Sequence, residues 1–130
     1  MGSSNEAAIA NLIHSRTNSK TTDLCGQFIL SELMEVLSKV KAVISNDSGP
    51  MHIAAALGKP QIAIFGATHP RLGFKPLNDK AVILSSDLPC QPCSLHGGES
   101  CPLKHFKCMR SILPETLVQS LHKLTQTISA

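Results

Sequence analysis

Short apolar runs alternate with amphipathic stretches along most of this chain. The runs Lys41–Ser45, Gln61–Phe65 and Ala81–Leu84 are short, apolar and rich in β-branched residues, which is typical of strands buried in a parallel sheet. Asp23–Gly26 predicts a further, very short strand that a glycine turn closes. Buried strands separated by helical stretches predict βαβ units.

The amphipathic stretches predict four helices. In the last of them, Leu117, Leu121 and Leu124 recur at helical spacing, so these three side chains should face inward. Gly58 and Pro60 predict the end of the helix that precedes the second buried strand. The sequence therefore predicts an α/β fold, a Rossmann-like parallel sheet with flanking helices. The four helices are expected at Asn5–Ser15, Leu30–Lys39, Pro50–Leu57 and Pro114–Ile128.

Composition narrows the class of protein. The 130 residues predict a single domain over 1–130, and 42% hydrophobic with 16% charged residues excludes a disordered chain. The net charge of +3 is spread along the chain and aromatic residues make up only 3%, which argues against nucleic-acid binding. No apolar run is long enough for a membrane span and no secretory signal is visible, so we expect a cytoplasmic protein without stable membrane insertion.

The segment Ser45–His52 carries the clearest chemistry. It leaves the carboxyl end of a buried strand and opens a helix at once, and ligands of open α/β sheets bind at such strand ends. Backbone N–H groups near Gly49 and Met51 would then face an anion, which the helix dipole favours. Asp47 is suited to accept hydrogen bonds from sugar hydroxyls, and His52 could donate to a phosphate oxygen. The alternative is that Asn-Asp-Ser-Gly only caps the helix.

A longer block around this segment resembles glycosyltransferase family 9, the ADP-heptose:lipopolysaccharide heptosyltransferases and their relatives. The block runs from Asp47 to Pro60 (DSGPMHIAAALGKP) and continues with IAIFGATHP at 62–70. Cysteine- and proline-containing pieces between Pro89 and Met109 extend the resemblance. The resemblance implies the C-terminal donor-binding domain of a two-domain, GT-B, inverting enzyme that needs no metal or other cofactor.

The resemblance also implies roles for individual residues. Asp47 would hold hydroxyls of the donor sugar, while Ser48 and Gly49 would present N–H groups to the diphosphate. Phe28, with Gln27, would lie near the base of the nucleotide. The remaining donor-binding residues implied are Met51, His52, Gly66 and Thr68. The expected donor is a nucleotide sugar, with ADP-heptose favoured, used in the synthesis of lipopolysaccharide core or a related glycan.

The chain departs from the family at its N-terminal side. The opening strand of the domain, its glycine loop with a phosphate-binding lysine and the following strand are absent, as is the acidic general base of the acceptor domain. We therefore expect no catalytic residue in these 130 residues and no transfer by the chain alone. A non-catalytic nucleotide-binding module, or half of a split enzyme, is the alternative function. The strand at Lys41–Ser45 would become an open edge, which could pair in a homodimer.

Four cysteines lie in a loop predicted at 86–113. Their spacing is Cys90-x2-Cys93-x7-Cys101-x6-Cys108, and only the first pair has the spacing of a zinc knuckle. A metal site, one or two disulfides and free thiols all remain open, and we predict no metal ligand. A small metal-binding interaction protein is the corresponding third hypothesis for function. His69, in the glycine loop after the second buried strand, is a further candidate ligand residue.

Overall fold

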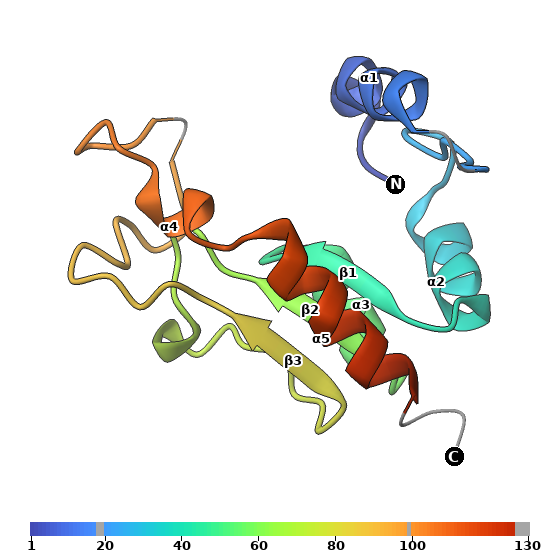
Figure 1. The fold of residues 1–130 in the computed structure, drawn as a ribbon. Helices are drawn as coiled ribbons and strands as arrows, with labels where there is room; N and C mark the ends of the chain where they lie inside the picture. The colour runs from blue at the N-terminus through green and yellow to red at the C-terminus, as the bar shows by residue number, and fades with distance from the viewer. Residues whose placement is uncertain (18–19, 99, 127–130) are drawn as a thin grey trace. The chain divides into compact units, whose positions relative to one another are not determined.

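The computed structural model describes residues 1–17, 20–98 and 100–126, drawn in Figure 1. The chain divides into two compact units, Met1–Val36 and Leu37–Ala130. The boundary falls inside helix α2 (Leu30–Lys39), whose bounds match the prediction. The candidate site residues that follow β-strands all belong to the second unit.

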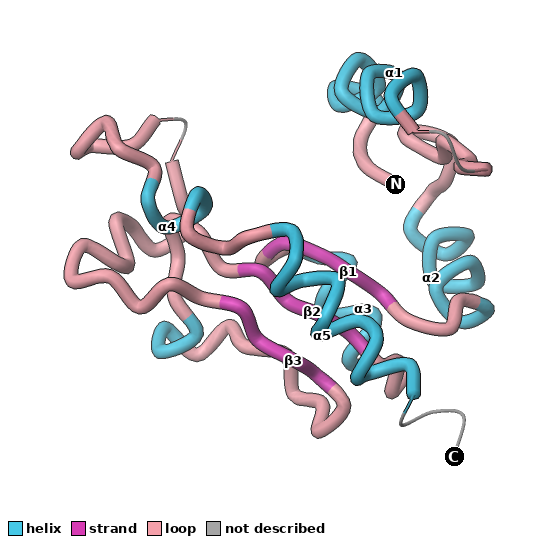
Figure 2. Tube along the Cα trace, viewed as in Figure 1, coloured by secondary structure: helices cyan, strands magenta, loops and turns pink. Residues whose placement is uncertain are grey.

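The second unit is built on a parallel sheet of three strands in the order β1-β2-β3 (Figure 2). They are β1 (Val43–Asn46), β2 (Gln61–Ile64) and β3 (Ala81–Leu84). Val43 pairs with Gln61, which pairs with Ala81, so the strands are in step. The predicted parallel α/β fold is confirmed. β1 begins two residues later than predicted, because the first hydrogen bond to its neighbour runs from Val43 N–H to the Pro60 carbonyl (2.9 Å).

Helices cover both faces of this sheet. Helix α3 (Gly49–Ala56) packs on β1 and β2, while α5 (Pro114–Gln126) packs on β2 and β3. In Figure 1, α5 crosses in front of the sheet and α3 lies behind it. The inward-facing leucines predicted in α5 are half-buried, as expected, and the predicted end at Ile128 lies outside the described residues. This layering is Rossmann-like.

The core lies between β2 and α3. Phe65, Met51 and Ala63 form one cluster in which each residue is 0% exposed. Burial of this kind contributes roughly 1.5 to 3 kcal/mol for each large apolar side chain. Gly58 ends α3 at a φ of +62°, a left-handed conformation that glycine adopts without strain. The core therefore holds α3 directly against β2, the strand that precedes the loop beginning at Gly66.

The first unit differs from the prediction at two points, since the helix predicted at Asn5–Ser15 begins two residues later and the strand predicted at Asp23–Gly26 is absent. A 3₁₀ turn (Ser4–Glu6) precedes α1 (Ala7–Arg16), which buries no side chain. The strand predicted at Asp23–Gly26 is wrong, since this segment is a turn. The Asp23 carboxylate accepts the Cys25 N–H at 2.9 Å, and Gly26 has a φ of +67°. An aspartate that bonds its own backbone two residues on favours a turn over a strand.

The two edges of the sheet differ. Beyond the carboxyl ends of the strands lie the 3₁₀ turn η2 (Pro70–Leu72) and the loop 86–113, which includes the short helix α4 (Lys107–Arg110) (Figure 1). At the amino edge is a cavity of about 680 Å³, between the starts of β1 and β3 and the end of α5.

No helix within the described residues is long and apolar enough to cross a membrane.

Candidate functional site

The turn from β1 into α3 opens at the carboxyl edge of the sheet. Asp47 continues the ladder, since its N–H donates to the Ile64 carbonyl at 3.1 Å. Ser48 then adopts an extended conformation and is the N-cap residue of α3. Its hydroxyl lies 3.1 Å from both the Asn46 carbonyl and the Ser45 hydroxyl and does not bond the helix N–H groups. The simple capping interpretation therefore lacks the hydrogen bond that defines a side-chain cap.

The first turn of α3 leaves peptide donors available. Within the described residues, the Gly49 N–H meets no protein acceptor, and Pro50 has no N–H to offer. The space beside the Gly49 Cα is open, since a Cβ there would have no neighbour within 4 Å. The Met51 N–H, in contrast, donates to the Ser48 carbonyl at 3.1 Å, and the Met51 side chain is in the core. Of the two donors predicted, Gly49 is the freer one.

The other predicted residues of this segment surround the same turn. Asp47 is half-exposed at the end of β1, and His52 is exposed in the first turn of α3. Both side chains are therefore accessible from solvent. Phe28 belongs to the first unit, so its predicted place near a nucleotide base stays a prediction.

The loop after β2 is held by the cysteine-containing loop. The buried side-chain amide of Gln91 donates to the Gly66 carbonyl at 2.6 Å and lies 3.5 Å from the Thr68 carbonyl. The Cys93 N–H donates to the Ala67 carbonyl at 2.8 Å. The Thr68 side chain is buried, so this residue can offer a ligand mainly its backbone. Sequence analysis missed Gln91, because a single glutamine in a loop belongs to no periodic pattern.

His69 is used inside the protein. Its Nε2 lies 2.7 Å from Oδ1 of Asp87, and its Nδ1 accepts the Arg71 N–H at 3.1 Å. The second bond requires an unprotonated Nδ1, so Nε2–H donates to the carboxylate. The hydrogen bond from His69 is the main reason that the pKa of Asp87 lies below its ordinary value. With both ring nitrogens engaged, His69 acts as a link between the loops after β2 and β3.

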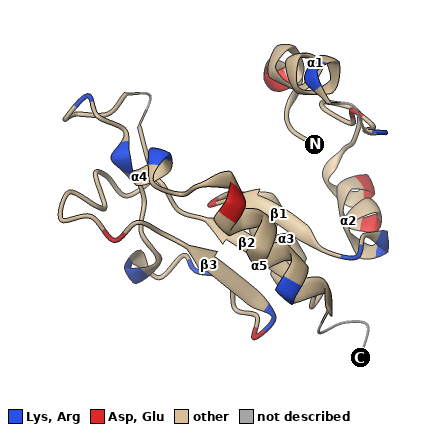
Figure 3. Ribbon diagram, in the orientation of Figure 1, with Lys and Arg blue, Asp and Glu red and all other residues tan. Residues whose placement is uncertain are grey.

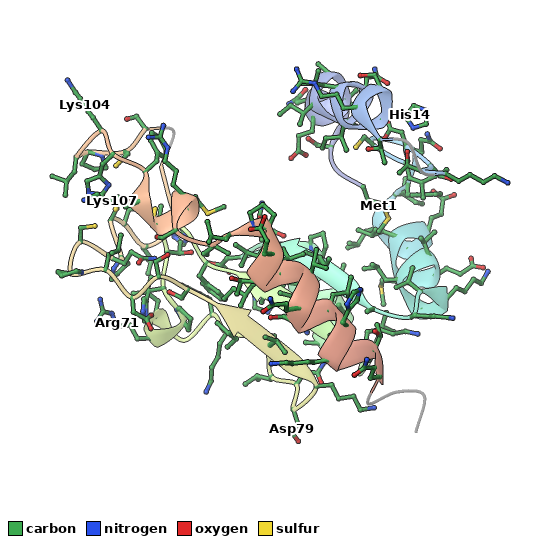
Figure 4. The ribbon with its side chains drawn as sticks, in the orientation of Figure 1. Met1, His14, Arg71, Asp79, Lys104 and Lys107 are labelled. Carbon is green, nitrogen blue, oxygen red and sulfur yellow. The ribbon has the colours of Figure 1, made fainter. Side chains whose placement is uncertain are left out.

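Several basic residues belong to the segments beyond the carboxyl ends of the strands. Arg71, Lys104 and Lys107 all come from the loops beyond the carboxyl ends of the strands (Figure 4). In Figure 3 the same region carries blue segments at α4 and in the neighbouring loops, together with a red segment in the loop after β3. The Arg71 guanidinium also donates to the Gln91 carbonyl. A positively charged surrounding favours an anionic ligand over a neutral one.

All five cysteines are free thiols. The described part of the chain contains no group of three histidine, cysteine or acidic side chains placed to hold a metal ion. Cys93 is exposed, but partial desolvation and the neighbouring thiols raise its pKa. Hydrogen bonds from backbone N–H groups, that of Phe106 first, lower the pKa of Cys101. The thiols thus differ in chemistry although they share one loop.

Comparison with known proteins decides the family. The profile of glycosyltransferase family 9 (heptosyltransferase) matches residues 1–105. The chain belongs to glycosyltransferase family 9. Lipooligosaccharide heptosyltransferase 2 of Campylobacter jejuni is 35% identical over 108 residues, which are 83% of this chain and 33% of that protein. The chain thus spans about a third of the length of the curated relatives it matches.

Two solved structures share the fold. The Escherichia coli ADP-heptose lps heptosyltransferase II superposes with a TM-score of 0.74 at 26% identity, covering 99% of this chain and 36% of that one. A glycosyl transferase family 9 protein from Veillonella parvula gives a TM-score of 0.77 at 22% identity, covering 97% and 35%. The Rossmann-like α/β architecture expected from the sequence is confirmed by both.

Proposed function

We propose that this chain is the donor-binding part of an inverting heptosyltransferase that acts in lipopolysaccharide core or related glycan synthesis. The donor is a nucleotide sugar, and ADP-heptose is the candidate that the relatives' names favour. The observation that carries the proposal is the turn from β1 into α3. There a half-exposed carboxylate, a Gly49 N–H without an acceptor in the described part of the chain, and open space beside the glycine adjoin the N-terminus of a helix.

Different residues of this turn bind the sugar and the diphosphate of the donor. Asp47 accepts hydrogen bonds from hydroxyls of the sugar, and the N–H groups of Ser48 and Gly49 bind the diphosphate, with His52 beside them. During transfer an acceptor hydroxyl forms a bond to the anomeric carbon while the bond to the diphosphate oxygen breaks. The acceptor proton passes to a base outside these 130 residues. N–H groups and the dipole of α3 stabilise the charge that grows on the leaving diphosphate.

An NMR titration with ADP tests this site. ADP should shift the amide signals of Ser48 and Gly49 at one common midpoint. Shifts confined to Lys41 and Lys80 would instead place the anion in the cavity at the amino edge, and shifts confined to the loop 94–105 would also contradict the proposal. A control with adenosine, which lacks phosphates, should leave Gly49 unmoved.

The chain alone should transfer no sugar. It should bind donor without turnover, because the family resemblance assigns the base to the acceptor domain. The decisive assay incubates the 130-residue chain with ADP-heptose and a lipopolysaccharide acceptor that a complete heptosyltransferase glycosylates in parallel. Product formed by the chain alone would contradict the assignment, whereas restoration of activity by a separate acceptor-domain chain would support the split-enzyme alternative.

We also propose that the free edge of β1 forms a homodimer. β1 pairs with β2 alone within the described residues. Val43 and Asp47 direct their N–H groups toward β2, so Ile44 and Asn46 direct theirs to the other side. Ile44 is also 44% exposed. An open, apolar strand of this kind favours pairing with a second strand.

A further inference from the structure

Three successive carbonyl groups of the loop after β2 contact one short segment of the cysteine-containing loop. The side-chain amide of Gln91 donates a hydrogen bond to the Gly66 carbonyl and, at a longer distance, to the Thr68 carbonyl. The intervening Ala67 carbonyl accepts from the Cys93 N–H. The orientation of three peptide groups is therefore set from outside the loop.

The same contacts fix where the N–H groups of these peptides point. Each peptide bond here is trans, so its N–H is directed opposite to its carbonyl. The N–H groups of Ala67, Thr68 and His69 consequently point away from Gln91 and Cys93. None of these three N–H groups donates a hydrogen bond to an acceptor within the described residues. Since peptide donors in a folded protein are almost always satisfied, water or a ligand must accept them.

These donors lie at the same edge of the sheet as the helix N-terminus. Ile64, two residues before Gly66, accepts the Asp47 N–H at 3.1 Å. The loop after β2 and the β1–α3 turn thus start side by side from neighbouring strands. Successive N–H groups in a curved loop form an anion-binding concavity.

We propose that Gln91 is a positioning residue, which aims the N–H groups of Ala67 and His69 at the diphosphate of the donor. This inference rests on the proposed donor-binding function. Gln91 is suited to the task because it is 2% exposed and fully bonded. Its Oε1 accepts the Leu88 N–H at 2.9 Å, which leaves the amide nitrogen facing the two carbonyls. Its own carbonyl is held by Arg71.

The test compares ADP titrations of the 130-residue chain and its variants by amide NMR. In the wild type, Ala67 and His69 should shift with the same midpoint as Ser48 and Gly49. Gln91→Met keeps the length of the side chain and removes its donors. The loop signals should then no longer respond, Ser48 and Gly49 should still shift, and binding should weaken about tenfold. Gln119→Met, on the exposed face of α5, is the matched control and should bind like the wild type.

The outcomes separate the two proposals. If ADP shifts neither the signals of Ser48 and Gly49 nor those of Ala67 and His69 in the wild type, the proposed donor site itself is wrong. If Ser48 and Gly49 shift while Ala67 and His69 do not, the donor site stands and the role of Gln91 is overturned. Unchanged affinity and unchanged loop shifts in Gln91→Met would overturn it as well. Should that variant fail to fold, Gln91→Glu, which keeps an acceptor for Leu88, is expected to show the same selective loss, and the wild-type titration remains decisive by itself.

Discussion

His69 donates from Nε2 to the Asp87 carboxylate across 2.7 Å and so joins the loop after β2 to the loop after β3. Asp87 reaches this partner from a backbone with a φ of +49°, which few residues other than glycine, asparagine and aspartate tolerate. The hydrogen bond between His69 and the Asp87 carboxylate therefore accompanies a left-handed backbone conformation at Asp87. It also gives the His69 side chain a partner within the protein, although the residue lies beside the candidate ligand site.

Asp87→Asn should make the protein less sensitive to acid. The pKa of Asp87 is lower in the folded chain than in an unfolded one, with the His69 bond as the first cause. Its stabilisation is therefore complete above about pH 4 and is lost as the pH falls below that value. Asparagine tolerates the same φ but does not titrate there.

Urea unfolding at pH 6 and pH 3 checks this prediction. The wild type should lose more stability between the two pH values than Asp87→Asn does. Asp23 and Glu6, whose pKa values are also lowered by local hydrogen bonds, are common to both proteins and cancel in the comparison. Equal losses would show that the bond to His69 contributes nothing to acid sensitivity.

Asp47→Asn should weaken binding of ADP-heptose more than binding of ADP. If the carboxylate accepts sugar hydroxyls, its loss removes charged hydrogen bonds that ADP never makes, which corresponds to about a tenfold to hundredfold loss of affinity. Calorimetric titration with both ligands measures the difference. Asp79→Asn, at the amino edge of the sheet, is the control with the same change of charge. Equal losses for ADP and ADP-heptose would remove Asp47 from the sugar site.

Cys101 should react with iodoacetamide at lower pH than Cys93. Backbone N–H groups stabilise the Cys101 thiolate and lower its pKa, while partial desolvation and neighbouring thiols raise the pKa of Cys93. Because the thiolate is the nucleophile, each alkylation rate follows its own titration. Peptide mass spectrometry across a pH series should give a half-maximal rate for Cys101 at the lower pH. Coincident curves, or the reverse order, would contradict the described geometry around Cys101.

Ile44→Lys should shift the chain from dimer to monomer. A lysine on an open strand opposes pairing with another strand, because pairing would desolvate its charge. Light scattering over a concentration series should give the wild type a mass of about twice 13.9 kDa and the variant a mass near 13.9 kDa. Val118→Lys, on an exposed face of α5, is expected to remain dimeric. A wild type that stays monomeric at every concentration would exclude the dimer.

Hydrophobic pattern was sufficient for the sheet and its helices. β3 and α2 match their predicted bounds, and the other two strands shift by one or two residues at their ends. The exception is Asp23–Gly26, where a short apolar pair suggested a strand. There the bond from Cys25 N–H to the Asp23 carboxylate gives the backbone a local partner, so the chain turns. Side-chain bonding of this sort competes with strands and leaves no periodic trace in sequence.

The candidate site could be predicted only in part. The residues Asp47 to Gly49 were recognisable because a strand end, a glycine and a proline stand together at the start of a helix. The Ser48 hydroxyl was less predictable, since it bonds toward Asn46 and Ser45 and not toward the helix. The positioning role proposed for Gln91 could not be predicted, although the residue lies within the pieces that carry the family resemblance. Its role depends on tertiary contact with a carbonyl 25 residues earlier in the chain.

The attachment points of the cysteine-containing loop also limit where this chain can accept extra residues without losing its contacts. The first part of the loop is held to the loop after β2 by Gln91 and Cys93. Its last part is held at Cys108, whose carbonyl accepts a hydrogen bond from the Ser86 hydroxyl at 2.8 Å. Between these points lies the largely exposed stretch 94–98, in which the Ser94 hydroxyl donates to the Gly97 carbonyl at 2.6 Å. Lengthening a surface loop costs little closure entropy. Insertions should therefore accumulate in 94–98, while a single added residue between Ser86 and Gln91 would move the glutamine out of reach of Gly66.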